Sequence, residues 1–191
     1  VSLYTYTNGD EVELFLNGKS LGVKKNSNDP KLRARIKWDN IAYAPGTLVA
    51  VAEKNGKVVA RHQIETTGEA VALKLVPDAE NWHADGKDLM HVCIYAVDKK
   101  GRRVLNVKDA KAFDKLTFTV KGDANIVAVD NGNIASDELH IGKTQLEKSI
   151  QRNLFQGSAL VILRAGDKPG KIELSVAGEK MKAKKLVLNT K

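Results

Sequence analysis

The chain of 191 residues has one cysteine, few aromatic residues and no long apolar run. The single Cys93 excludes an internal disulfide framework. Aromatic residues make up 5% of the chain and hydrophobic residues 42%, which favours globular domains with small aliphatic cores over disorder. No apolar run approaches the ~20 residues of a membrane-crossing helix, so we predict no membrane span.

The formal net charge of +8 is spread along the chain and comes mostly from lysine. A nucleic-acid-binding surface would gather Lys and Arg on one face, with aromatic residues between them. Arg33, Arg35 and Lys37 alternate with apolar residues, which is typical of the solvated side of a half-buried strand. We therefore predict no nucleic-acid partner.

Apolar and polar side chains alternate with a period of two along the whole chain. Residues 11–16 alternate in this way and end at Asn17-Gly18, a pair that suits the tight turn of a β-hairpin. Asn55-Gly56 predicts a second hairpin with the same turn chemistry. Further strand-like runs cover residues 32–38, 70–76, 89–98, 116–120, 126–129, 159–164, 171–176 and 182–188.

This pattern predicts an all-β fold of two tandem immunoglobulin-like β-sandwiches. The polar, turn-rich segment 77–88 suggests a boundary, so the expected domains are residues 1–76 and 77–191. In residues 144–155, Leu146, Ile150 and Leu154 have helical spacing. A short helical turn is one interpretation of that segment, and an extended connection is the preferred one.

Several motifs of the first half resemble the module that follows the catalytic barrel in bacterial β-galactosidases of glycoside hydrolase family 2. They are Tyr4, Thr7-Asn8, residues 11–18, Leu21-Gly22, Trp38, Tyr43, Pro45-Gly46 and Leu48. The second half is similar to the next immunoglobulin-like domain of that family. Its matching motifs are residues 84–89, 97–101, 129–133, Arg152, Phe155, Gly157, 159–162 and 169–172.

The resemblance implies a non-catalytic C-terminal region that acts as a structural or accessory scaffold in a larger glycosidase. Its expected partners are the catalytic barrel and the other domains of the parent chain. The resemblance further implies a periplasmic, cell-surface or secreted location. The absence of an initiator Met and of a signal peptide is expected if the ends were cut from a longer chain.

No catalytic, cofactor or metal residue is assigned from the sequence. Glu11 and Glu13 share a strand face, but an open sheet would solvate both carboxyl groups, which does not suit a proton donor. Residues 130–133 (Asp-Asn-Gly-Asn) offer closely spaced oxygens, yet a tight turn explains them better than a calcium loop. Cys93 is expected to be a structural thiol, and the four histidines show no metal-ligand spacing.

Carbohydrate binding is the alternative function, because aromatic rings can stack on the apolar faces of sugars. Trp38 alternates into the expected core, whereas Trp82 lies in the segment between the expected domains and Tyr95 lies on an outward strand face. Trp82 and Tyr95 are therefore the candidate carbohydrate contacts of a carbohydrate-binding or adhesive immunoglobulin-like module.

Overall fold

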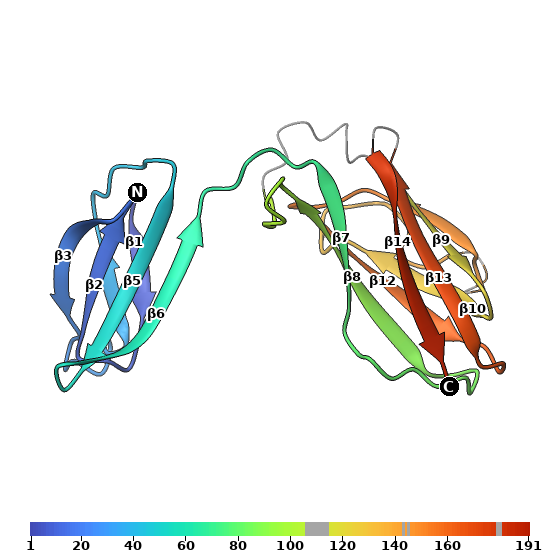
Figure 1. Ribbon diagram of the computed structural model, residues 1–191, viewed down its shortest axis with the longest axis horizontal. Helices are drawn as coiled ribbons and strands as arrows, with labels where there is room; N and C mark the ends of the chain where they lie inside the picture. Colours follow the sequence, from blue (N-terminus) through green and yellow to red (C-terminus); the bar gives the residue numbers. More distant parts are fainter. Residues whose placement is uncertain (106–114, 143, 145, 179–180) are drawn as a thin grey trace. The chain divides into compact units, whose positions relative to one another are not determined.

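The computed structural model describes residues 1–105, 115–142, 144, 146–178 and 181–191, with only the backbone of residues 181 and 182. Every regular element in these ranges is a β-strand, and all the strand pairs are antiparallel (Figure 1). The chain forms two compact units, Val1–Thr66 and Thr67–Lys191. In these described ranges, no helix is long and apolar enough to cross a membrane. The all-β expectation is confirmed.

The first unit is a sandwich of a four-stranded sheet, in the order β3-β2-β5-β6, and a two-stranded sheet, β1-β4. Its strands are β1 (Leu3–Tyr6), β2 (Glu11–Leu16), β3 (Lys19–Lys25), β4 (Arg35–Trp38), β5 (Thr47–Lys54) and β6 (Lys57–Glu65). The core consists of Val12, Leu14, Ile36, Trp38 and Ala52. The alternation predicted for residues 11–16 therefore places its apolar side chains between the two sheets.

Both predicted hairpins of the first unit are present. The φ angles of Asn17 and Gly18 are 52° and 81°, and those of Asn55 and Gly56 are 51° and 69°. Positive φ at both central positions gives the turn a twist that matches the flanking strands. The prediction of a strand over residues 32–38 was partly wrong: β4 begins only at Arg35, and Leu32 lies outside the strand and is 46% exposed.

The second unit is a sandwich of two four-stranded sheets, in the orders β10-β12-β8-β7 and β11-β9-β13-β14. Its strands are β7 (Ala72–Pro77), β8 (Leu89–Val97), β9 (Leu116–Lys121), β10 (Ala124–Asp130), β11 (Ser149–Arg152), β12 (Ser158–Ala165), β13 (Gly170–Gly178) and β14 (Met181–Thr190). Alternate residues of each inner strand are fully buried, as Val92, Ile94 and Ala96 of β8 show. Burial of one face per sheet explains the period of two.

The division between the units lies ten residues before the expected boundary at 76/77. Strand β7 pairs with β8 along its whole length, from Ala72 opposite Val97 to Pro77 opposite Val92. A strand that completes the sheet of the second unit cannot belong to the first. The polar segment 77–88 is therefore a connection between β7 and β8 inside the second unit, and not a linker between units.

The segment with helical spacing is extended where the structure describes it. Glu147 forms a bridge with Ile126, and β11 pairs with β9 from Ser149 opposite Thr119 to Arg152 opposite Leu116. The preferred interpretation of an extended connection is confirmed for residues 147–152. The four-residue spacing of apolar residues did not produce a helix there because the sheet supplies the backbone partners.

Candidate functional site

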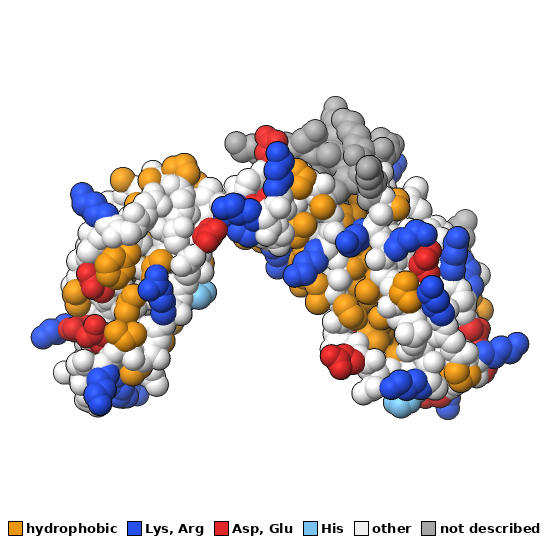
Figure 2. Space-filling model, viewed as in Figure 1, with side chains coloured by type: hydrophobic (Ala, Val, Ile, Leu, Met, Phe, Trp, Pro, Cys, Tyr) orange, Lys and Arg blue, Asp and Glu red, His pale blue; other side chains and the backbone are white. Residues whose placement is uncertain are grey.

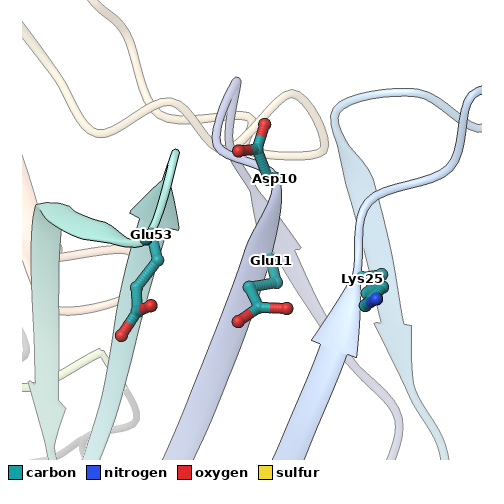
Figure 3. A pocket seen from close by; sticks show the side chains of 5 residues that line it. Asp10, Glu11, Lys25 and Glu53 are labelled. Carbon is teal, nitrogen blue, oxygen red and sulfur yellow. The ribbon is translucent and has the colours of Figure 1, made fainter.

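Three acidic residues of the first unit, Asp10, Glu11 and Glu53, line a shallow cavity of about 250 Å³ at one end of the four-stranded sheet (Figure 3). Glu11 of β2 lies directly opposite Glu53 of β5 on one side and Lys25 of β3 on the other. Asp10 is committed to the hairpin, because its carboxylate accepts the N–H of Asn55 at 2.7 Å. The carboxylates of Glu11 and Glu53 extend along neighbouring strands on an open sheet, which does not provide the enclosed environment of a general acid.

The loop that follows β10 is a succession of side-chain-to-backbone turns. The carboxylate of Asp130 accepts the N–H groups of Asn131 and Gly132, at 2.6 and 3.1 Å. The side-chain oxygen of Asn131 accepts the N–H of Asn133 at 3.0 Å, and that of Asn133 accepts the N–H of Ala135 at 3.1 Å. These oxygens are occupied by backbone donors, as in Asx turns, which favours the turn over a calcium loop.

Arg152 of β11 anchors this loop from inside the second unit. Its side chain is fully buried, and Nη1 donates to the backbone oxygen of Glu138 at 2.5 Å. Nη2 lies 3.4 Å from Asp130 Oδ1 and 3.5 Å from Asn131 Oδ1, and Nε lies 3.5 Å from Glu138 Oε2. The guanidinium therefore connects both ends of residues 130–138 to the sheet.

The Asp130 carboxyl has a lowered pKa, mainly because the N–H of Gly132 stabilises its ionised form. The N–H of Asn131 and the nearby His140 and Arg152 also lower this pKa, whereas the partial burial of the carboxyl group raises it. Asp130 therefore stays ionised opposite Arg152.

Asp98 organises a second turn, between β8 and the bridge at Arg103. Its side chain accepts the N–H groups of Gly68, Lys100 and Arg102 at 3.0, 2.9 and 3.0 Å. The Arg102 guanidinium pairs with the same carboxylate at 2.7 Å. This ion pair is the largest of the interactions that hold the pKa of Asp98 well below its ordinary value. Asp98 thus ties the residues before β7 to the end of β8.

Of the two candidate carbohydrate contacts, Trp82 is buried and Tyr95 is partly covered. The Trp82 side chain is 1% exposed, lies in the core of the second unit and donates its indole N–H to the backbone oxygen of Asp88 at 3.0 Å. Tyr95 is half-buried, and the guanidinium carbon of Arg103 lies 4.7 Å from its ring centroid. The expectation that Trp82 presents a stacking surface does not agree with its burial, because the segment 77–88 folds onto the second unit.

The two sheets of the second unit have outer faces of different character. One row crosses β11, β9, β13 and β14 and is polar, with Ser149, Thr119, Ser175 and Lys185 in register. On the other sheet, the outer face carries a set of half-buried apolar residues. We call this set the apolar outer face: Val76, Cys93, Ala128, Leu160 and Ile162.

Exposed tyrosines of the first unit are a feature that the sequence analysis did not single out as a site. Tyr6 is 75% exposed, Tyr43 70% and Tyr4 47%. The alternation in residues 3–6 could have indicated that Tyr4 and Tyr6 share a face. Figure 2 shows a face of the molecule on which Lys and Arg side chains are dispersed over both units and mixed with acidic ones.

Two family models match the chain. Residues 73–187 match the glycoside hydrolase family 2 C-terminal domain 5, and residues 1–60 match a domain of unknown function (DUF4982). The sheet pairing defines an all-β protein built from two antiparallel sandwiches. Because the first match covers more than half of its residues, the chain belongs to the family of glycoside hydrolase family 2 C-terminal domain 5.

Individual relatives agree with this assignment. The β-galactosidase BoGH2A of Bacteroides ovatus is 38% identical over 174 residues, which are 91% of this chain and 19% of that protein. A β-glucuronidase of Formosa agariphila is 32% identical over 125 residues, 64% of this chain and 12% of that protein. The crystal structure of a glycosyl hydrolase family 2 member from Bacteroides cellulosilyticus superposes with a TM-score of 0.81 at 30% identity, covering 100% of this chain and 23% of that one. The chain thus spans about a fifth or less of these curated relatives.

Proposed function

We propose that the chain is a non-catalytic, C-terminal part of a family 2 glycosidase and serves as a scaffold for the catalytic domain. The observation that carries this proposal is the match of residues 73–187 to a C-terminal domain of the family, in a chain that covers only 19% of a 38% identical β-galactosidase. A retaining glycosidase needs two carboxyl groups ~5–5.5 Å apart beside its substrate. The parent's activity would come from a barrel outside these residues.

The apolar outer face supports the scaffold role. An outward strand face in a free sandwich is normally polar, as the row through Thr119 and Ser175 shows. On the opposite sheet, Val76, Cys93 and Leu160 form a continuous apolar row across three strands. Such a row suits a contact with another domain of the parent chain, which would remove it from water.

A chromogenic β-galactoside assay and its glucuronide counterpart test the absence of catalysis. The isolated chain is expected to give no turnover above the buffer background, because its neighbouring carboxylates Glu11 and Glu53 lie on an open sheet. Measurable turnover that survives repurification would contradict the proposal.

Mixing the chain with the separately produced remainder of its parent protein tests the scaffold contact. We expect the two to associate, and the double variant Leu160→Asp/Ile162→Asp to lose this association because it places charge on the apolar outer face. Thr119→Asp, on the polar face of the opposite sheet, is the matched control and should associate normally. Equal loss in the control variant, or no association of a folded unmodified chain, would count against the contact.

A location in the periplasm, at the cell surface or outside the cell is part of the same proposal and follows from the family resemblance alone. Fractionation of cells that express the full parent protein tests it. The full-length protein is expected in the extracytoplasmic fraction, and its recovery with cytoplasmic markers would contradict that location.

A further inference from the structure

The outer face of the small sheet in the first unit carries four long polar or aromatic side chains. In the register of β1 and β4, Tyr4 lies opposite Lys37 and Tyr6 lies opposite Arg35. The intervening pair, Thr5 and Ile36, faces the core, as does Leu3 opposite Trp38. Because side chains alternate across a strand, all four residues project from the same outward face. We call this set the tyrosine platform: Tyr4, Tyr6, Arg35 and Lys37.

The aromatic part of the platform is held in place by its own contacts. The rings of Tyr4 and Tyr6 are stacked, with centroids 6.4 Å apart and an interplanar angle of 27°. The guanidinium carbon of Arg35 lies 5.7 Å from the Tyr4 ring centroid. Tyr4 therefore contacts both neighbours, while Tyr6 stays 75% exposed. An exposed tyrosine that is already ordered loses little side-chain freedom when a ligand binds.

The two cationic side chains of the platform differ in whether they have a carboxylate partner. Lys37 Nζ lies 2.9 Å from Asp39 Oδ1, so the lysine already has a carboxylate partner. Arg35 has a ring contact with Tyr4, but no ion pair involving it is present among the described residues. A guanidinium in this state can receive a carboxylate through two parallel N–H donors.

The size of the platform limits the class of ligand. Strands β1 and β4 each have four residues, so the face is about 13 Å long and two strands wide. A stable protein–protein interface needs roughly 800 Å² from each partner, which a face of this size does not supply. A ligand of one to three rings fits the dimensions better than a folded domain.

From these observations we propose that the tyrosine platform binds an acidic saccharide, a short oligosaccharide that contains uronic acid. The apolar C–H face of one sugar ring stacks on the exposed ring of Tyr6, whose hydroxyl group remains in water. The carboxylate of the sugar pairs with Arg35. The inference is independent of the scaffold contact, because it concerns a different unit and a different face.

An NMR titration of the 191-residue chain with trigalacturonate tests the platform, with neutral galactotriose as the comparison sugar. A shallow face predicts a Kd on the order of 1 mM for the acid and a weaker one for the neutral sugar. Tyr6→Ala should raise the Kd for trigalacturonate about tenfold, the loss expected for one stacked ring. Arg35→Gln should raise it about fivefold and leave galactotriose binding unchanged.

Tyr43→Ala is the matched control, because Tyr43 is 70% exposed and lies in the loop between β4 and β5. It should leave both Kd values unchanged, and amide shifts should concentrate in β1 and β4. An equal loss in Tyr43→Ala, equal binding of the two sugars, or no shifts in β1 and β4 would overturn the proposal. Protection of Tyr6 from nitration by tetranitromethane in the ligand-free, full-length parent protein would also overturn it, since another domain would then cover the face.

Discussion

Two charged side chains with little exposed surface hold the turns of the second unit in place. Arg152 is fully buried and reaches residues on both sides of the loop after β10, and Asp98 accepts three backbone N–H groups besides its ion pair with Arg102. Both belong to motifs that carry the family resemblance. Their contacts are to backbone and to neighbouring loops, so the motifs define local structure, and no reaction needs to be invoked to explain them.

Replacing Arg152 by methionine should destabilise the second unit by about 2–3 kcal/mol. The substitution keeps an apolar stem but leaves the backbone oxygen of Glu138 without the Arg152 donor and removes the positive charge that faces Asp130 and Glu138. Urea unfolding measures the change. Arg164→Met, on the outer face of β12, is the control and should change stability by less than about 0.5 kcal/mol; similar losses for the two variants would show that Arg152 does not anchor the loop.

Asp98 should make the second unit sensitive to acid. Because its folded-state pKa lies below the unfolded value of about 3.9, its contribution is complete above that pH and disappears as the pH falls toward the folded pKa. The Asp98→Asn variant should therefore be less stable than the unmodified chain at pH 7. The difference in unfolding free energy should shrink below about pH 4. Urea midpoints at several pH values measure this, with the exposed Asp137→Asn as control. A difference that stays constant down to pH 2 would contradict the role of the charge.

The hairpins of the first unit depend on glycines in turns that demand positive φ. Gly56 has a φ of 69°, and no atom lies close to the position that a Cβ atom would take. Glycine is therefore favoured here by the left-handed backbone conformation and not by lack of space for a side chain. Gly18 is in the same situation, with a φ of 81°. The two Asn-Gly pairs set the register of β2 with β3 and of β5 with β6, which decides the side chains that reach the core.

Substituting alanine for Gly56 should destabilise the first unit by about 1–2 kcal/mol, the cost of a left-handed conformation for a residue with a Cβ atom. Thermal unfolding measures the loss. Gly170 offers a control, because it also has open space but no left-handed φ. Gly170→Ala should leave the melting temperature nearly unchanged, and an equal effect of the two substitutions would reject the conformational explanation.

The whole chain consists of two units with separate cores of very different size. Among the residues that the structure describes, the core cluster of the first unit has five buried apolar residues and that of the second unit has nineteen. A larger core buries a greater share of apolar surface and gives a larger margin of stability. The two units therefore differ in the free energy that holds each of them folded.

Calorimetry of the chain should show two transitions, the first from residues 1–66 and the second from residues 67–191. Each unit has its own core and can unfold cooperatively by itself. A fragment of residues 67–191 should retain the upper transition within about 3 °C, less than the shift that 1 kcal/mol gives in a domain of this size. A single transition, or an unfolded fragment, would contradict this independence.

Local patterns in the sequence predicted most of the strands and both tight turns of the first unit. Period-two alternation identified the buried sides of β2, β8 and β13, and Asn-Gly pairs identified both hairpins, because these signals depend on neighbours a few residues away. The same patterns could not assign β7 to the second unit, because only the tertiary structure shows that β7 pairs with β8. Trp82 was misplaced for a related reason: its indole N–H is satisfied by Asp88 in a segment that composition alone marks as a loop.

Alternation along a strand is a property of neighbouring residues, so the all-β class and the order of the hairpins could be read from the amino acids. Which residues share an outer face depends on how the strands pair, and strand pairing is a long-range outcome. Tyr4 and Tyr6 are exposed on the outer side of the two-stranded sheet of the first unit. Val76, Cys93 and Leu160 come into register only after three separate segments pair. The candidate contact surfaces thus arise from strand pairing between segments far apart in the sequence, which no local pattern encodes.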